Sequence, residues 1–167
     1  SWSPDGRSIL YTSYKEGNPS LFLFDLFSGK EGKFSSRTGL NLGAKWSPTG
    51  KQVAVTLERQ GNTDIYLLDS SGNVVRRLTE YAGIDVSPTW SPDGRSIAFV
   101  SDRSGGPQIY IMDVDSGKTR RLTFAGGYNT SPDWSPKGDR IAYTSRVGGR
   151  FHIMTAAVQG GEPQDLT

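Results

Sequence analysis

The sequence predicts an all-β fold, namely a β-propeller of four-stranded antiparallel blades that forms an incomplete ring. The first observation is an internal repeat: Trp-Ser-Pro-x-Gly recurs at Trp2, Trp46, Trp90 and Trp134, each 44 residues after the last. The second observation is that short apolar runs alternate with turn residues, and that no stretch shows sustained helical periodicity. Four-stranded units of about 40 to 50 residues are typical of propeller blades.

The same elements follow one another in every repeat, and the third repeat shows them most clearly. Trp90 precedes Ser-Pro-Asp-Gly, which predicts a type I turn because Pro fixes φ and Gly takes the last place. Residues 96–101 predict a strand. Residues 108–113 predict another, and this run is apolar on both faces, so its sheet must be covered on both sides. A turn at 115–118 then leads to an Arg-rich outer strand at 120–123.

The whole chain, residues 1–167, is therefore interpreted as one stretch of propeller. Complete blades are expected at about 40–79, 84–123 and 128–167, with the segment before each Trp as the inner strand. The first repeat has its three outer strands but only Ser1-Trp2 of the inner one. Because each repeat buries its core against its neighbours, we do not expect the chain to be a stable closed monomer by itself.

Composition excludes several classes of protein. Lys plus Arg minus Asp plus Glu is 19 − 17 = +2, which fits no strongly basic nucleic-acid binder. Apolar runs such as 109–112 are far shorter than the roughly 20 residues of a membrane span, so membrane insertion is not expected. There is no Cys, and hence no disulfide and no thiolate nucleophile. The start at Ser1, without a signal peptide, indicates a piece of a longer chain.

Catalytic patterns are largely missing. His152 is the only histidine, it has no evident orienting carboxylate, and no Gly-x-Ser-x-Gly elbow is present. Asp25, Asp69 and Asp113 share one phase of the repeat, which predicts a local hydrogen bond made once per blade. Catalytic residues would be expected to break the repeat. The arginines of the outer strands are interpreted as a solvated edge, with an anionic partner as the alternative; they are Arg76, Arg77, Arg120 and Arg121.

The residues that lead into each inner strand are the strongest candidates for a binding site. Aligned by the repeat, they form three sets of equivalent positions: Leu40, Ile84 and Tyr128; Asn41, Asp85 and Asn129; and Leu42, Val86 and Thr130. In a propeller these sets form concentric arcs at one mouth of the channel, where Asp85 and Val86 are expected to be exposed. Such arcs offer a partner both hydrogen bonds and apolar burial. The alternative is that Asn and Asp close Asx-turns while the residues of the first set pack between blades.

The repeats resemble those of the TolB β-propeller family. The resemblance rests on Trp-Ser-Pro-Asp-Gly-Arg-Ser-Ile-Ala-Phe-Val-Ser-Asp-Arg at 90–103, Ile-Tyr-Ile-Met-Asp at 109–113 and Arg-Leu-Thr at 121–123, and it covers essentially all of the chain. It implies about four blades of a six-bladed propeller in the periplasm of Gram-negative bacteria. It also implies the lipoprotein Pal as partner within the Tol–Pal cell-envelope system, with links to cell division and protein transport. The family's contact with TolA would use an N-terminal segment that these residues do not include.

The same resemblance implies a set of protein-binding residues: Leu40, Asn41, Gly43, Asp85, Val86, Tyr128, Asn129 and Thr130. The family carries His, Ala and Thr where this chain has Leu40, Gly43 and Val86, so those three contacts differ here. No cofactor is expected. A calcium ion in the channel is the alternative, because hard oxygen ligands suit calcium, although only Asp85 of its arc is charged.

Two functions follow from this reading of the sequence. The first is a non-enzymatic protein-binding scaffold that binds Pal. The alternative is the substrate-gating propeller of a serine peptidase of the prolyl oligopeptidase type, because such propellers carry the same repeat motif. In that case the hydrolase domain would lie outside these residues.

Overall fold

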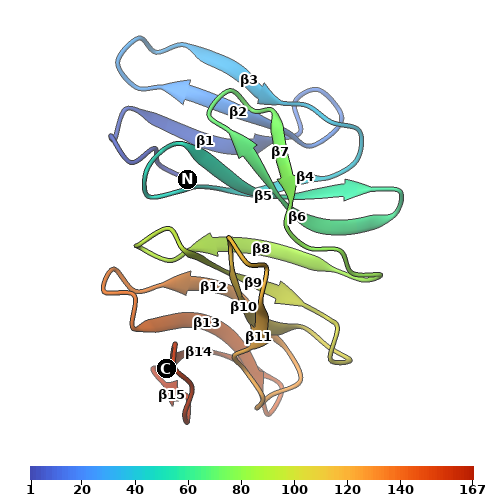
Figure 1. The fold of residues 1–167 in the computed structure, drawn as a ribbon, viewed down its shortest axis with the longest axis vertical. Coiled ribbons are helices and arrows are strands. Elements are labelled where there is room, and N and C mark those ends of the chain that lie inside the picture. The colour runs from blue at the N-terminus through green and yellow to red at the C-terminus, as the bar shows by residue number, and fades with distance from the viewer. The chain divides into compact units, whose positions relative to one another are not determined.

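The computed structural model describes residues 1–167 as fifteen β-strands in four antiparallel sheets, with no helix, which confirms the all-β fold (Figure 1). It has no helix that could cross a membrane. The first sheet contains β1 (Ser8–Ser13), β2 (Ser20–Asp25) and β3 (Glu31–Ser35). The second contains β4 (Asn41–Trp46), β5 (Gln52–Arg59), β6 (Asn62–Asp69) and β7 (Val74–Arg77). The third contains β8 (Asp85–Trp90), β9 (Ser96–Ser101), β10 (Gln108–Asp113) and β11 (Thr119–Arg121). The fourth contains β12 (Asn129–Trp134), β13 (Arg140–Val147), β14 (Arg150–Ala157) and β15 (Gln164–Asp165).

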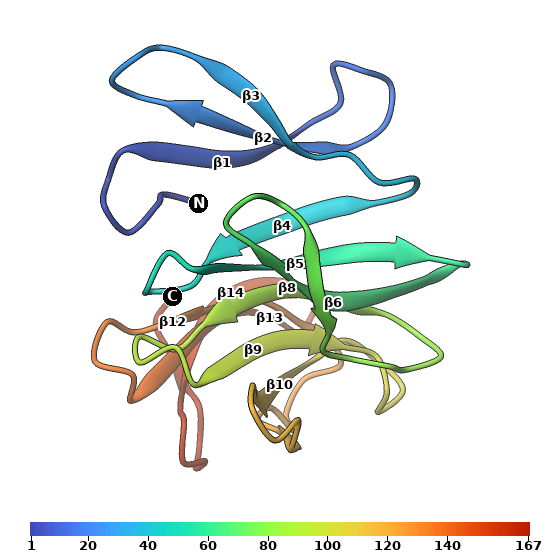
Figure 2. The same cartoon turned by 45° about the horizontal axis from the view of Figure 1, so that its top comes forward.

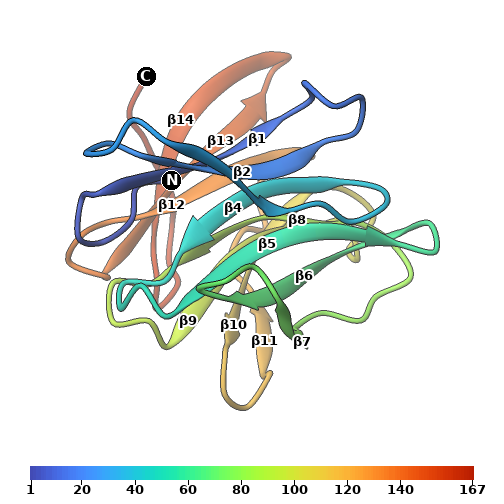
Figure 3. The ribbon, with the colours of Figure 1, turned by 90° about the horizontal axis from the view of Figure 1, so that it is seen from above.

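The chain divides into two compact units, Ser1–Pro88 and Thr89–Thr167. In the first unit, β4 of the second sheet packs against β1 and β2 of the first, and Figure 2 shows β4 beside β1. In the second unit, β12 of the fourth sheet packs against β9 and β10, whose hairpin with β11 is visible in Figure 3. Strand β8 begins in the first unit and ends in the second. Each unit therefore contains sheets that cover one another.

The two middle strands of the second and third sheets are buried on both faces. In β5, residues Val53 through Leu57 are all buried, and in β10 the run from Gln108 through Met112 is too. Consecutive side chains of a strand point to opposite faces, so both faces of these strands are covered. This confirms the covered sheet that was expected from the apolar run at 108–113.

The predicted turn after each Trp is present in all four repeats. Gly6, Gly50, Gly94 and Gly138 each donate their N–H to the carbonyl of the Ser three residues earlier, at 2.9 Å. All four glycines have positive φ, between 69° and 77°, a conformation that is cheap only for glycine. The turn thus follows directly from the Ser-Pro-x-Gly sequence.

The tryptophans before these turns occupy equivalent positions, because Trp46, Trp90 and Trp134 end β4, β8 and β12. Their burial is not uniform. Trp90 is 7% exposed, whereas Trp46 and Trp134 are half-buried and Trp2 is 62% exposed. Of the three, only Trp90 is therefore largely buried.

The Leu-Thr pairs that end the second, third and fourth repeats have the same structural role. The Thr79 hydroxyl accepts the N–H of Ile65 at 2.9 Å, and the Thr123 hydroxyl accepts that of Ile109 at the same distance. The preceding leucine donates its own N–H to the carbonyl of the same isoleucine in each case. Each pair thus satisfies both backbone groups of one residue in a middle strand.

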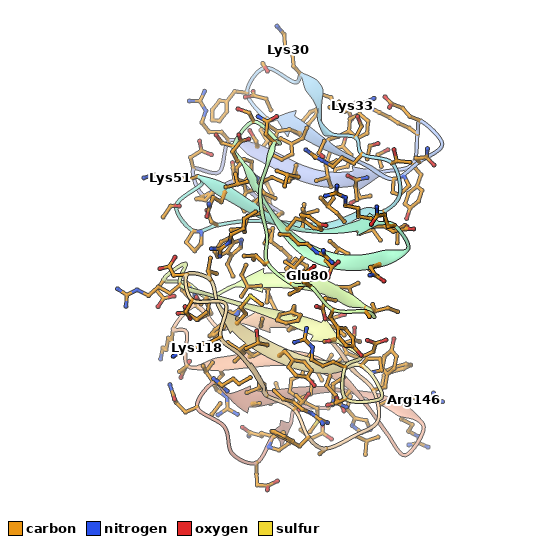
Figure 4. The ribbon with its side chains drawn as sticks, turned by 45° about the vertical axis from the view of Figure 1, so that its right-hand side comes forward. Lys30, Lys33, Lys51, Glu80, Lys118 and Arg146 are labelled. Carbon is orange, nitrogen blue, oxygen red and sulfur yellow. The ribbon has the colours of Figure 1, made fainter.

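The aspartates at the ends of the third strands of the repeats accept local hydrogen bonds, as predicted. Asp25 accepts from the N–H of Phe27 and Ser28, and Asp113 accepts from the N–H and hydroxyl of Ser116. Such bonds stabilise the charged carboxylate, so the pKa values of Asp25, Asp69 and Asp113 lie below their ordinary value of 3.8. The lysines of nearby turns are solvated; Lys30 and Lys51 point away from the ribbon in Figure 4.

Gly72, in the turn between β6 and β7, makes the closest backbone approach in the first unit. It is buried with φ of 86°, and a Cβ built on it would lie 1.9 Å from the carbonyl oxygen of Phe34 in β3. The first and second sheets therefore meet at a point where no side chain fits.

We predict that Gly72→Ala destabilises the chain by about 2–4 kcal/mol, because roughly 1 kcal/mol of left-handed strain adds to about 1–3 kcal/mol of overpacking. Gly117→Ala is the matched control, since Gly117 also has positive φ but open space around its Cβ position. Urea unfolding of both variants measures the difference. Equal losses of stability would show that the contact with Phe34 is unimportant.

A second prediction concerns the stability of the fold at low pH. A carboxyl group whose pKa is depressed by folding contributes stability above its unfolded pKa, and this contribution is lost as the pH falls through the folded pKa. Stability should therefore fall as the pH drops below about 3.8, the ordinary value for these aspartates. Asp113→Asn should be less stable near neutral pH and should show a shallower acid loss in thermal melts across this range. An unchanged acid profile would contradict this.

Candidate functional site

The structure places the polar members of the candidate set inside the protein. Asn41, Asp85 and Asn129 are the first residues of β4, β8 and β12, and each is 0% exposed. The expectation that Asp85 is exposed is therefore wrong. A side chain with no accessible surface cannot contact a partner while the chain keeps this fold.

Hydrogen bonds explain why the two asparagines are buried. The Asn41 amide donates to the carbonyls of Arg37 and Gly39, at 2.8 and 3.2 Å, and thereby closes the loop between β3 and β4. The Asn129 amide donates to the carbonyl of Ala125 and to Gln108 Oε1, both at 2.8 Å. These contacts favour the alternative interpretation, in which these asparagines hold the loops before the strands.

A left-handed residue follows in each of these strands. Gly43, Ser87 and Ser131 have φ of 63°, 56° and 53°, and the register of β4 and of β12 shifts around this point. Such a shift is a β-bulge, which bends a strand and redirects its side chains. Gly43 is thus needed for backbone conformation, and two serines accept the same strained position.

In the first unit, the structure brings Gly43 close to the segment that contains Val86. A Cβ on Gly43 would lie 3.9 Å from the Cα of Ser87, and the Ser87 N–H donates to the Thr56 hydroxyl in β5 at 3.2 Å. Val86 itself is half-buried, as is Leu40. These side chains therefore keep some surface beside the buried asparagine and aspartate.

In the second unit, Tyr128 is 42% exposed and Thr130 is half-buried. The Tyr128 ring meets the exposed Phe151 ring edge-on, with centroids 6.2 Å apart. The alternative expectation that Tyr128 packs between blades is therefore not met, because its ring contacts a hairpin of its own unit and remains accessible. These two aromatic rings form an exposed apolar patch.

His152 has a carboxylate neighbour that the sequence did not reveal. Its Nδ1 lies 2.8 Å from Asp165 Oδ2, across the pair β14–β15. Hydrogen bonds from Thr167, and the charge of His152, hold the pKa of Asp165 below its ordinary value. His152 also occupies the repeat position of Asp64 and Gln108, which accept hydrogen bonds from Thr79 and Thr123. This repeat position therefore carries a polar side chain in all three blades.

Three of the four arginines of the outer strands, Arg76, Arg77 and Arg120, are exposed, as expected of a solvated edge, but several of the four also make specific contacts. Arg77 pairs with the buried Asp64 at 2.7 Å, and Arg121 donates to the carbonyl of Thr123 at 2.5 Å while lying over the ring of Phe124. Arg120 hydrogen-bonds to the carbonyl of Val158. These contacts hold the outer strands against neighbouring strands and loops. No group of three or more His, Cys, Asp or Glu side chains that could hold a metal ion is present.

Comparison with known proteins assigns this arrangement to a family. The family model described as the TolB β-propeller domain matches residues 1–167. TolB from Acinetobacter baumannii superimposes with a TM-score of 0.92 at 36% identity, over 99% of this chain and 42% of that one. A putative TolB from Agrobacterium tumefaciens gives a TM-score of 0.88 at 31% identity, over 99% of this chain and 60% of that one.

Sequence comparison alone finds a shorter match. The Tol-Pal system protein TolB of Xanthomonas campestris is 45% identical over 40 residues, which are 24% of this chain and 9% of that protein. The chain thus spans only part of its relatives. A puromycin hydrolase also superimposes, with a TM-score of 0.76 at 16% identity, over 98% of this chain and 27% of that one. Identity this low shows a shared fold only.

The buried asparagines lead to a prediction that separates folding from binding. Asn129→Ala should lower the free energy of unfolding by about 1–3 kcal/mol, because it leaves the Ala125 carbonyl without its partner in the interior. Thr130→Ala, at the half-buried neighbouring position, is the control and should change stability little. Thermal melts of both variants measure this. An Asn129→Ala variant with unchanged stability would contradict the structural role.

Proposed function

Because the chain belongs to the TolB β-propeller family, we propose that it is a non-enzymatic scaffold that binds a peptidoglycan-associated lipoprotein, Pal. The observation that carries the proposal is the match of the family model to all 167 residues. The similarity to A. baumannii TolB over 99% of the chain supports it. On this proposal the protein acts in the Tol–Pal system of the periplasm.

The proposed Pal surface is the predicted set of loop residues, with the roles of its members divided. Leu40, Gly43 and Val86 in the first unit, and Tyr128 and Thr130 in the second, retain accessible surface and would contact the lipoprotein. Asn41, Asp85 and Asn129 are fully buried and would instead hold the loops that carry those contacts. Preformed loops reduce the entropy lost on binding, which favours affinity.

The alternative function, a gating propeller of a serine peptidase, has weaker support. The puromycin hydrolase shares the fold at 16% identity, whereas the two TolB structures share 36% and 31%. A shared propeller does not imply a shared activity, because function depends on the site and not on the fold. The contact with TolA remains proposed for an N-terminal segment outside these residues.

Val86 provides the test. In a full-length TolB-type protein that carries this sequence, Val86→Glu should weaken Pal binding at least about tenfold, because the interface would bury a charge without a partner. Val75→Glu is the control, since Val75 is 57% exposed on the outer strand β7. Isothermal titration calorimetry with purified Pal measures both affinities, and thermal melts check that each variant is folded. Equal affinity of the Val86 variant and the wild type would place the Pal surface elsewhere.

A further inference from the structure

The second repeat departs from the other three at two positions of its second strand. Position 57 is Leu, whereas the equivalent positions 13, 101 and 145 are Ser. Position 55 is Val, whereas positions 11, 99 and 143 are aromatic. Residues that follow the repeat maintain the fold, so a departure in one blade marks a place where that blade can have a separate role.

In the first and third repeats, a cation covers an aromatic pair at this place. The rings of Tyr11 and Phe22 lie 6.1 Å apart, and Lys15 Nζ lies 3.9 Å from the centroid of the Phe22 ring. In the third repeat, the rings of Phe99 and Tyr110 are also 6.1 Å apart. The guanidinium of Arg103 lies 5.0 Å from the Tyr110 centroid, and its Nε donates to the Ser101 hydroxyl at 2.8 Å.

The second repeat cannot form this arrangement. Val55 faces Tyr66 across the strand pair, so one ring of the pair is missing. Leu57 has no hydroxyl to accept a hydrogen bond from Arg59, which makes no ring contact, hydrogen bond or ion pair through its side chain. Gln60 and Gly61, both with positive φ, close a two-residue hairpin that carries Arg59 at its edge. No cation of the second repeat therefore covers the tyrosine ring, which neighbouring side chains still enclose.

A cleft of about 430 Å³ lies there, entirely within the first unit. It is lined by Ser36, Arg37, Thr38, Leu57, Glu58, Arg59, Tyr66 and Val74. The Tyr66 hydroxyl, on a side chain that is 4% exposed, is buried and has no hydrogen-bond partner. A buried polar group without a partner is costly, and its persistence needs a reason. A ligand that accepts this hydrogen bond would supply one.

The chemistry of the walls defines that ligand. The apolar part of the wall consists of Leu57, Val74 and the Tyr66 ring. The charged part has two arginines, Arg37 and Arg59, and one carboxylate, Glu58, so the net charge of the wall is positive by one. The volume falls within the roughly 300–1,000 Å³ typical of small-molecule sites. We propose that this cleft binds a small apolar molecule with a carboxylate group, whose oxygens accept from the Tyr66 hydroxyl and pair with Arg59. The proposal does not rest on the binding of Pal.

The test uses 4-phenylbutyrate as the probe, titrated into a full-length TolB-type protein that carries this sequence while the methyl NMR signals of Leu57 and Val74 are followed. We expect saturable shifts at millimolar concentration. Tyr66→Phe should weaken binding by about 2- to 10-fold, the effect of one lost hydrogen bond. The variant should fold normally, because the hydroxyl it removes has no partner. Tyr110→Phe, at the equivalent position of the third repeat, is the matched control and should bind as the wild type does.

Two further measurements keep the outcome clear. The uncharged 4-phenylbutan-1-ol should bind more weakly than the carboxylate. The double variant Val55→Phe with Leu57→Ser restores the pattern of the third repeat and should abolish binding, because Arg59 can then cover the rings. The proposal is overturned if the two methyl signals do not shift, if Tyr66→Phe binds as tightly as the wild type, or if the alcohol binds as well as the carboxylate.

Discussion

The burial of both faces of the middle strands is the constraint on which the rest of this structure depends. Strands such as β5 and β10 carry apolar residues in consecutive positions, so neither face of their sheets can be left in water. Each sheet therefore needs a neighbouring sheet, as in the pairs β4 with β1 and β12 with β9. The remaining polar atoms of the backbone must then be satisfied locally. The Ser-Pro-x-Gly turns do this in all four repeats, the aspartates in the first three and the Leu-Thr pairs in the last three.

The features that repeat could be predicted from the sequence, because one period repeats the same local interactions. The turn after each Trp, the strands on either side of it and the hydrogen bonds of Asp25 and Asp113 depend on residues only a few positions apart. Such interactions are encoded by spacing alone. The fold class follows from them, because four similar units that each lack a covered face must pack together.

The candidate site was harder to predict, because exposure depends on packing between distant segments. Asn and Asp at the start of a strand are compatible with two roles: contacting a partner, or closing the loop before the strand by hydrogen bonds. The choice is made by contacts such as that of Asn129 with Gln108, 21 residues away. The carboxylate beside His152 depends likewise on the pairing of β14 with β15. The cleft over Tyr66 did have a signal in the sequence, namely Leu57 and Val55, which interrupt the repeat. That signal could be interpreted only once the structure showed that a cation covers an aromatic pair at this place in the first and third repeats.

The Leu-Thr pairs have a consequence for how the protein behaves at high concentration. Their hydroxyls and backbone groups occupy hydrogen-bonding positions that a longer outer strand would otherwise fill, and the outer strands are short: β11 has three residues and β15 has two. An exposed sheet edge is a template on which another chain can add a strand and start aggregation. Where a sheet ends in a threonine hydroxyl, as the second, third and fourth sheets do, the repeat leaves little edge for such a strand to join.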